Sequence, residues 1–321
     1  MEKRKFDITA FGEMLIDFTF QGFNEMNQKL FSQNAGGAPA NVLVAANKLG
    51  ANTSFLGKAG NDMHGKFLKE TLNKENVNNT GFILSDDVFT TLAFVDLNKC
   101  GERTFSFARK PGADTMMEKE DICLEILKDS NIFHIGSLSL THNPSKETTF
   151  YSLEKAKEFG CIISYDPNYR DSLWESEEKA IKEMRSIIPY VDIMKVSDEE
   201  ITLMTDEKDP KSAAENLIQQ GIKIVVITLG ADGAFVATKH GGQIIPGFES
   251  NVVDTTGAGD AFWGGFLFRI SQSEKRPEEF TLEEISDFAL FANAVASICV
   301  ESYGAIAAMP SMEKVIEVMK K

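Results

Sequence analysis

The stretch of this sequence with the clearest chemical meaning is a turn of small residues that precedes an apolar run. Residues 254–265 read D-T-T-G-A-G-D-A-F-W-G-G. We expect residues 251–254 to end a strand and a helix to run from residue 261 onward. The first amides of a helix lack an internal partner and lie at the positive end of its dipole. The pattern therefore predicts that Gly257, Ala258 and Gly259 offer N–H groups to a phosphate, which small residues allow to approach the backbone.

Asp260 places a carboxylate inside this predicted anion-binding turn. A carboxylate would repel a bound phosphate, so its presence suggests a second role. One interpretation is a general base that takes the proton from an attacking hydroxyl while the amides stabilise a transferred phosphoryl group. The alternative is a structural turn in which Asp260 only interacts favourably with the helix dipole. The residues of the turn leave both interpretations open.

Composition and charge limit the class of protein. The chain has 321 residues, of which 43% are hydrophobic, enough for the large core of one α/β domain, which we expect to span residues 1–321. The formal net charge of −15 argues against nucleic acid or an anionic membrane as a partner. An anionic substrate must therefore be held by local donors.

The cysteines and the N-terminus indicate the compartment. Cys100, Cys123, Cys161 and Cys299 lie far apart without a C-x-x-C pair, so neither a disulfide framework nor a zinc site is indicated. The first residues show no hydrophobic signal region, and no run of 18 apolar residues occurs. We expect a soluble, cytoplasmic protein that is not exported.

Most of the chain alternates between strand and helix patterns. Strands are predicted at residues 6–12, 54–57, 131–135, 161–165, 193–196, 222–229, 235–238 and 243–246, and helices at residues 38–49, 145–159, 175–187 and 288–300, with an amphipathic helix at the end. This alternation predicts an α/β fold with a doubly wound, mostly parallel sheet flanked by helices.

Two segments depart from the alternation. Residues 18–34 and residues 82–109 show hairpin patterns, the second with a polar turn at residues 98–101. We expect a small β-sheet, formed by residues of about 14–34 and 82–110, that projects from the main sheet as a lid over a substrate. Its exposed strands can pair with the lid of a second copy, which would give a homodimer.

Polar residues follow several predicted strands, where ligands gather in open α/β sheets. Asp17 is a candidate for holding a polar substrate, although a solvated loop carboxylate is an equal alternative. In A-G-G-A-P-A-N (residues 35–41), Gly36 and Gly37 allow close approach of the backbone, and Asn41 projects from the first helical turn. Arg109 is a candidate donor to substrate, although exposed turns often carry such charges.

Further candidates stand in the second half of the chain. Asp166, Asn168 and Arg170 follow a strand, and Arg170 can neutralise phosphate charge. Glu200 can face a hydrated Mg²⁺, or it can complete a capping box with Ser197. The turn between Gly230 and Gly233 lies where a nucleotide can approach.

The two glycine-rich motifs carry a resemblance to a known family. D-T-T-G-A-G-D-A-F-W-G-G together with A-G-G-A-P-A-N resembles the signatures of the ribokinase-like carbohydrate kinases, the PfkB group, across the whole chain. Leu43 departs from the small residue that the family prefers there. The segments G-E-M-L-I-D, F-A-R-K-P-G-A-D, S-Y-D-P-N-Y-R and K-V-S-D-E-E are most similar to fructokinases. The resemblance implies transfer from ATP to D-fructose, giving fructose 6-phosphate and ADP, with Mg²⁺ accompanying ATP and often K⁺ near the anion site.

The resemblance also implies a role for individual residues. It makes Asp260 the base and Gly257 to Gly259 the anion site. The implied sugar-binding residues are Asp17, Gly36, Gly37, Asn41 and Arg109. The implied nucleotide- and phosphate-binding residues are Asn168, Arg170, Lys195, Thr228, Gly230, Gly233 and Asn293. Glu200 is implied near Mg²⁺, and Asp254, Thr256 and Gly304 around a monovalent cation.

Three functions remain in competition. The first is a fructokinase. The second is a kinase of the same group for another acceptor, such as 2-keto-3-deoxygluconate, ribose or a nucleoside. The third is a sugar- or nucleotide-binding regulator without chemistry, against which the intact Asp260 and glycines argue.

Overall fold

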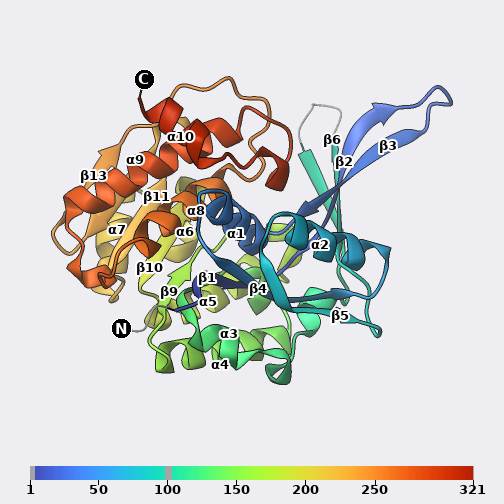
Figure 1. Ribbon diagram of the computed structural model, residues 1–321, viewed down its shortest axis with the longest axis horizontal. Helices are drawn as coiled ribbons and strands as arrows, with labels where there is room; N and C mark the ends of the chain where they lie inside the picture. Colours follow the sequence, from blue (N-terminus) through green and yellow to red (C-terminus); the bar gives the residue numbers. More distant parts are fainter. Residues whose placement is uncertain (1–3, 98–102, 321) are drawn as a thin grey trace.

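The computed structural model describes residues 4–97 and 103–320 of the chain. Two layers of helices enclose a large sheet, and a smaller sheet stands away from this body (Figure 1). The predicted polar turn at residues 98–101, which includes Cys100, lies outside the described residues.

The large sheet is mostly parallel. Its strands are β1 (Phe6–Phe11), β4 (Thr53–Gly60), β5 (Asn78–Ser85), β8 (Ser130–Ile135), β9 (Ile162–Tyr165), β10 (Ile193–Ser197), β11 (Ile224–Thr228), β12 (Ala234–Thr238) and β13 (Gly241–Ile245). Within the described residues their order is β13-β12-β11-β10-β9-β8-β1-β4-β5, and only β12 pairs antiparallel with its neighbours. After β1, the chain adds β4 and β5 on one side of β1, and from β8 onward it adds the remaining strands on the other side. Ligands of open α/β sheets bind at such a reversal, outside the carboxyl ends of the strands.

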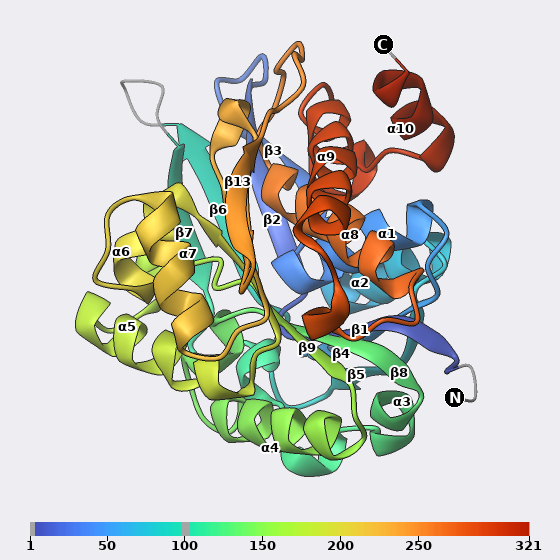
Figure 2. The ribbon, with the colours of Figure 1, turned by 90° about the vertical axis from the view of Figure 1, so that its left-hand side faces the viewer.

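Helices cover both faces of this sheet because the side chains of its strands alternate between two apolar layers. In β11, Ile224 and Val226 face one layer and Val225 and Ile227 face the other. The helices are α1 (Ala38–Lys48), α2 (Met63–Lys74), α3 (Leu124–Lys128), α4 (Ser145–Glu158), α5 (Glu177–Ser186), α6 (Ile201–Met204), α7 (Pro210–Gln219), α8 (Ala258–Ser271), α9 (Leu282–Cys299) and α10 (Met312–Met319). α1, α8 and α9 cover one face, and α4, α5 and α7 cover the other (Figure 2). The predicted doubly wound α/β fold is confirmed.

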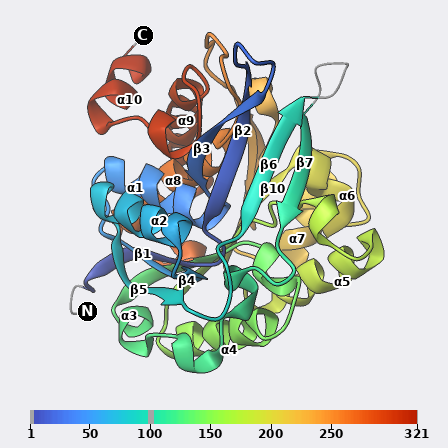
Figure 3. The ribbon, with the colours of Figure 1, turned by 90° about the vertical axis from the view of Figure 1, so that its right-hand side faces the viewer.

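The smaller sheet contains β2 (Leu15–Phe23), β3 (Lys29–Gly36), β6 (Leu92–Leu97) and β7 (Arg103–Ala108), in the order β3-β2-β6-β7. Figure 3 shows these four strands side by side. Phe18 stacks on Phe94 with ring centroids 5.2 Å apart, and Phe31 meets the same ring edge-on at 6.1 Å. Cross-strand aromatic pairs of this kind stabilise a sheet that has little other core.

Two predicted boundaries are wrong. Residues 82–85 lie in β5 at the edge of the large sheet, and the smaller sheet resumes only at Leu92. Residues 251–254 form no strand; Val252 and Val253 are 62% and 46% exposed, so their apolar character does not reflect burial. The amides of Val253 and Asp254 instead donate to the carbonyl of Val300 after α9, at 2.8 and 3.1 Å. This ties the segment before α8 to the end of α9.

No helix within residues 4–97 and 103–320 is both long enough and apolar enough to cross a membrane.

Candidate active site

A cavity of about 620 Å³ lies at the carboxyl ends of the central strands, between the large and the small sheet. Its lining comes from the four strands of the small sheet, the start of α1, the turn before α8 and residues 303–305. The segments that follow β1, β8, β9, β10 and β11 complete it. The predicted residues that line it are Asp17, Gly37, Asn41, Asn168, Arg170, Lys195, Glu200, Thr228, Gly230, Asp254, Thr256, Gly257, Gly259, Asp260 and Gly304. The fold therefore gathers residues from distant parts of the chain around one space.

Asp260 is the buried centre of this cavity, with 7% of its surface exposed. Asn41 donates from Nδ2 to one carboxylate oxygen at 2.8 Å, and Asn168 donates from Nδ2 to the other at 3.1 Å. Asn168 follows β9 with a φ of 47°, a left-handed conformation that asparagine tolerates better than most residues. Two amides from separate elements thus fix the orientation of the carboxylate.

The surroundings of Asp260 keep its pKa above the ordinary value. Burial raises the pKa to about 6, and the nearby Asp166 carboxylate acts in the same direction. The hydrogen bond from Asn41 and the positive charges of Lys195 and Arg170 oppose this rise. A carboxylate with this pKa is ionised at neutral pH and still able to accept a proton, as a general base requires.

The turn before α8 presents unpaired amides beside Asp260. Gly257 caps the helix with a φ of 79°, and a Cβ there would lie 2.6 Å from Cβ of Ala305. Within the described part of the chain, the amides of Gly257, Gly259 and Asp260 donate no hydrogen bond. Ala258 differs from the prediction, because its N–H donates to the carbonyl of Thr255 at 3.2 Å. Three amides at the positive end of a 14-residue helix remain for an anion.

Close packing of α1 against α8 sets the distance between Asn41 and Asp260. The two helices meet at Gly264, one turn after Asp260, where a Cβ would lie 2.5 Å from Cβ of Ala45 and 2.6 Å from the carbonyl oxygen of Val42. Only glycine allows the two backbones this approach.

Lys195 provides a buried positive charge next to the anion-binding turn. Its ammonium pairs with the carboxylate of Asp166 at 2.7 Å, and a Cβ on Gly259 would lie 3.5 Å from Nζ. Burial alone would lower the pKa of Lys195, but Asp166 and Glu200 outweigh it and raise the pKa. Lys195 therefore stays charged.

Asp17 lines the cavity from β2, and burial raises its pKa to about 6 against the opposing charge of Arg170. Gly36 does not line the cavity, but a Cβ there would overlap the Asp17 carboxylate, so Gly36 makes room for that side chain. Gly37 has a φ of 118° and passes the backbone of Glu13 so closely that a Cβ would collide with it. The glycine pair shapes the wall that carries Asp17.

Two acidic residues of the cavity wall, Glu200 and Asp254, accept hydrogen bonds from backbone amides. Glu200 accepts from the amides of Tyr169 and Ser197 at 2.7 and 3.0 Å, so the capping box is present. Asp254 accepts from the amide and hydroxyl of Thr256 at 3.0 and 2.7 Å and from the amide of Gly304 at 3.0 Å, which joins two loops. Among the residues that the structure describes, no group of three or more His, Cys, Asp or Glu side chains could hold a metal. The carboxylates of Glu200 and Asp254 therefore belong to no such cluster.

Three other predicted residues do not line the cavity. Arg109 donates to Asp114 at 2.8 Å and to Thr141 and the carbonyl of Leu138 at 2.9 Å each, so all three of its guanidinium nitrogens make contacts with these residues. Asn293 donates to the carbonyls of Ile245 and Pro246 at 3.1 and 2.9 Å, and holds the segment after β13. A Cβ on Gly233 would collide with the backbone at Ile245 and lie 2.5 Å from the amide nitrogen of Gly247, so this glycine serves the same segment. These three residues thus hold neighbouring segments in place and do not face the cavity.

Sequence reasoning gave no role to two carboxylates at this site, Glu13 and Asp166, although it placed Asp166 at a strand end with Asn168 and Arg170. Glu13 lines the cavity and is 4% exposed, and Asp166, which pairs with Lys195, is 1% exposed. Both directly follow the carboxyl end of a buried strand, β1 and β9, which is the same signal that pointed to Asp17.

Comparisons with known proteins agree with this geometry. The model of the pfkB family carbohydrate kinases matches residues 5–312. The chain is 39% identical over 318 residues to a protein of Arabidopsis thaliana named probable fructokinase-6, chloroplastic, covering 98% of this chain and 82% of the relative.

Solved structures share the whole fold. The structure of a fructokinase with bound ATP from Xylella fastidiosa superposes with a TM-score of 0.91 at 33% identity, covering 98% of both chains. A fructokinase double mutant from Vibrio cholerae O395, in a form with bound fructose, ADP and potassium ion, gives 0.88 at 30% identity over 99% of both chains. The family predicted from the two glycine-rich motifs is confirmed. The chain belongs to the pfkB family of carbohydrate kinases and is an ATP-dependent carbohydrate kinase.

Proposed function

We propose that the chain transfers the γ-phosphoryl group of ATP to the primary hydroxyl of D-fructose, giving fructose 6-phosphate and ADP. The observation that carries this proposal is the position of Asp260, held by Asn41 and Asn168 beside the unpaired amides of α8. The fructokinase names of its relatives support fructose as the acceptor.

Asp260 accepts the proton of the sugar hydroxyl as that oxygen attacks the γ-phosphorus. Because two amides fix the carboxylate, one oxygen lone pair can face the hydroxyl without reorientation during the reaction. Asp17, Gly37 and Asn41 form the sugar-binding wall.

The developing charge on the transferred group is met by fixed donors. The amides of Gly257, Gly259 and Asp260 and the ammonium of Lys195 surround the position for the phosphoryl oxygens. Arg170, Thr228 and Gly230 lie along the same cavity on the side proposed for the nucleotide.

Two ions accompany the proposal. Mg²⁺ is proposed to enter with ATP, bound to its phosphates, where it would neutralise phosphate charge. Mg²⁺ commonly keeps water and phosphate ligands, so it does not need a cluster of three or more acidic, His or Cys side chains, and the described residues contain none. A monovalent cation would lie near the loops that Asp254 joins, around Thr256 and Gly304. The Vibrio cholerae fructokinase in a potassium-bound form supports a requirement for a cation of this kind.

The small sheet is proposed to act as a lid. It contributes Asp17, Thr19 and Gln21 of β2 and Asn34 of β3 to the cavity wall, so its closure would exclude water from the sugar. We expect this to suppress hydrolysis of ATP when no sugar is bound.

The lid is also proposed to join two copies of the chain. Phe23, Met26 and Leu30, on and between β2 and β3, are 57%, 74% and 46% exposed. Light scattering coupled to size exclusion should therefore give twice the mass of 35.5 kDa, and Phe23→Ser should shift it toward the monomer. A monomeric wild-type protein at micromolar concentration would contradict this.

The free thiols of Cys123, Cys161 and Cys299 support a cytoplasmic location.

The acceptor is tested by measuring ADP release with a panel of fructose, 2-keto-3-deoxygluconate, ribose and a nucleoside. We expect kcat/KM to be at least about tenfold higher for fructose than for the others, a difference that one or two hydrogen bonds can supply. A higher value for another acceptor would replace fructose. No ADP release with any acceptor would favour a binding protein without chemistry.

A further inference from the structure

Glu13 is a buried carboxylate at the cavity with one oxygen in use and one oxygen free. Oε1 accepts from the amide of Ala38 at 3.1 Å, at the first turn of α1. Oε2 is buried and has no hydrogen-bond partner within residues 4–97 and 103–320. The side chain is 4% exposed and lines the cavity.

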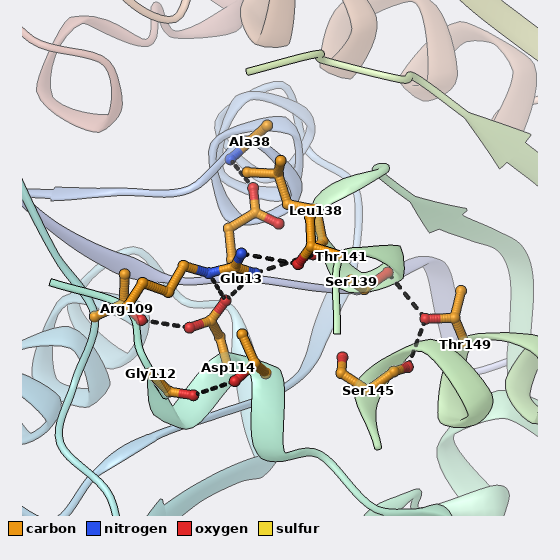
Figure 4. A network of polar contacts seen from close by, with 12 residues as sticks. Glu13, Ala38, Arg109, Gly112, Asp114, Leu138, Ser139, Thr141, Ser145 and Thr149 are labelled. Carbon is orange, nitrogen blue, oxygen red and sulfur yellow. Dashed lines mark hydrogen bonds and ion pairs between the residues drawn. The ribbon is translucent and has the colours of Figure 1, made fainter. Parts of the chain in front are cut away.

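The nearest cation does not satisfy the free oxygen. The guanidinium of Arg109 is committed to Asp114, Thr141 and the carbonyl of Leu138, as Figure 4 shows. Glu13 forms no ion pair within the described part of the chain. Among the described residues no donor reaches Oε2 with hydrogen-bond geometry, so a molecule that enters the cavity can supply one.

A purely structural role does not account for this arrangement. Capping the start of α1 needs a single acceptor, which Oε1 supplies, and an uncharged side chain could do the same. A carboxylate oxygen that is buried and unpaired destabilises the fold. A donor bound at Oε2 removes this cost.

The position of Glu13 matches a sugar bound at Asp260. Glu13 binds the amide of Ala38, and Asp260 binds the side chain of Asn41, three residues later on the same face of α1 and about 4.5 Å farther along its axis. The carboxylate of Asp17 lies against Gly36, two residues before Ala38, and both Asp17 and Glu13 line the cavity. Glu13 and Asp17 thus both contact residues 36–38, the turn at which the sugar is proposed to bind.

We propose that Glu13 binds the acceptor sugar: its free carboxylate oxygen accepts a hydrogen bond from a hydroxyl other than the one that is phosphorylated. This inference rests on the proposed function as a sugar kinase. It makes Glu13 a determinant of acceptor specificity, because a sugar without that hydroxyl leaves the buried oxygen unpaired.

The test combines enzyme variants with deoxy sugars. Glu13→Gln keeps an oxygen for Ala38 and loses the anionic acceptor, and Glu13→Met has no oxygen at all. Values of kcat and KM are measured at pH 8, above the pKa of about 7 to which burial raises Glu13, for fructose and for each monodeoxyfructose that keeps the primary hydroxyl. For fructose, both variants should raise KM about 10- to 100-fold with a smaller change in kcat, as expected for a lost hydrogen bond to a charged group. For one deoxy sugar, variants and wild type should agree within about twofold.

Asp114→Asn provides the matched control. Asp114 belongs to the same buried cluster, but both its oxygens are occupied, by Thr91 and Arg109, so its substitution should affect fructose and all deoxy sugars by the same factor. An equal loss for all sugars in the Glu13 variants, or no loss for fructose, would overturn the proposal. Wild-type turnover of fructose is measured first; if it is absent, the proposed acceptor fails instead, and the same cycle is run with the acceptor that is turned over and its deoxy analogues.

Discussion

The pH dependence of turnover tests the electrostatics of the cavity in a single experiment. Burial raises the pKa values of Asp260 and Asp17 to about 6 each, and Asp260 must be ionised to accept a proton. A group with a pKa of about 6 is about nine-tenths protonated at pH 5. We therefore expect kcat/KM for fructose to fall at least about tenfold between pH 7.5 and pH 5, and about 100-fold if Asp17 must also be ionised. If Glu13 binds the sugar as proposed, its protonation below a pKa of about 7 adds to this fall, and the Glu13→Gln variant removes that contribution.

The measurement needs two further arms. ADP should be quantified after quenching, because coupling enzymes have pH dependences of their own, and enzyme held at pH 5 should regain full activity at pH 7.5. Asn41→Ala removes a hydrogen bond that lowers the pKa of Asp260, so the acid limb should move to higher pH, by up to about one unit. A profile that stays flat to pH 5, or an acid limb centred near pH 4 as for an exposed aspartate, would refute this account of Asp260.

Two further substitutions test the supports of the site. Gly264→Ala should destabilise the protein by about 1–3 kcal/mol and lower kcat roughly 10- to 100-fold, because its Cβ would push α1, and with it Asn41, away from α8. The control is Gly136→Ala, whose Cβ would meet its neighbours only at 3.6 and 3.9 Å, so neither stability nor kcat should change. Thermal melts and steady-state kinetics measure the two quantities. Lys195→Met should cost about 3–5 kcal/mol by leaving Asp166 buried without its partner. Lys195→Met should also raise the KM for ATP, because the phosphates lose a positive charge. In the double variant with Asp166→Asn, most of the melting temperature should be recovered, whereas the KM for ATP should stay high. Recovery of both would mean that Lys195 acts only in stability.

The sequence was most informative where a local motif has one geometric solution. Gly257 requires a left-handed conformation, and the glycines at 36 and 37 allow an approach that a Cβ would block. These constraints, with strand and helix periodicity, predicted the α/β fold, α1 and α8. The grouping of Asp260 with Asn41 in one site was implied by the resemblance to the kinase family.

The errors have physical causes that no single segment reveals. Residues 82–85 have the same alternation as the small sheet because β5 is also a strand, and periodicity does not say which sheet a strand joins. Val252 and Val253 are apolar but exposed. Arg109 was expected to bind substrate but does not line the cavity, whereas Glu13, to which no role was assigned, does. The sequence does not reveal this because burial and pairing depend on contacts such as that between Arg109 and Thr141, which are 32 residues apart.

The most direct test of the central claim is the single-turnover rate of Asp260→Asn with saturating ATP and fructose. The account predicts a rate lower by roughly two to four orders of magnitude, with a smaller effect on sugar affinity, because the amide cannot take the proton of the attacking hydroxyl. A rate close to that of the wild type in a correctly folded variant would contradict the assignment of Asp260 as the general base.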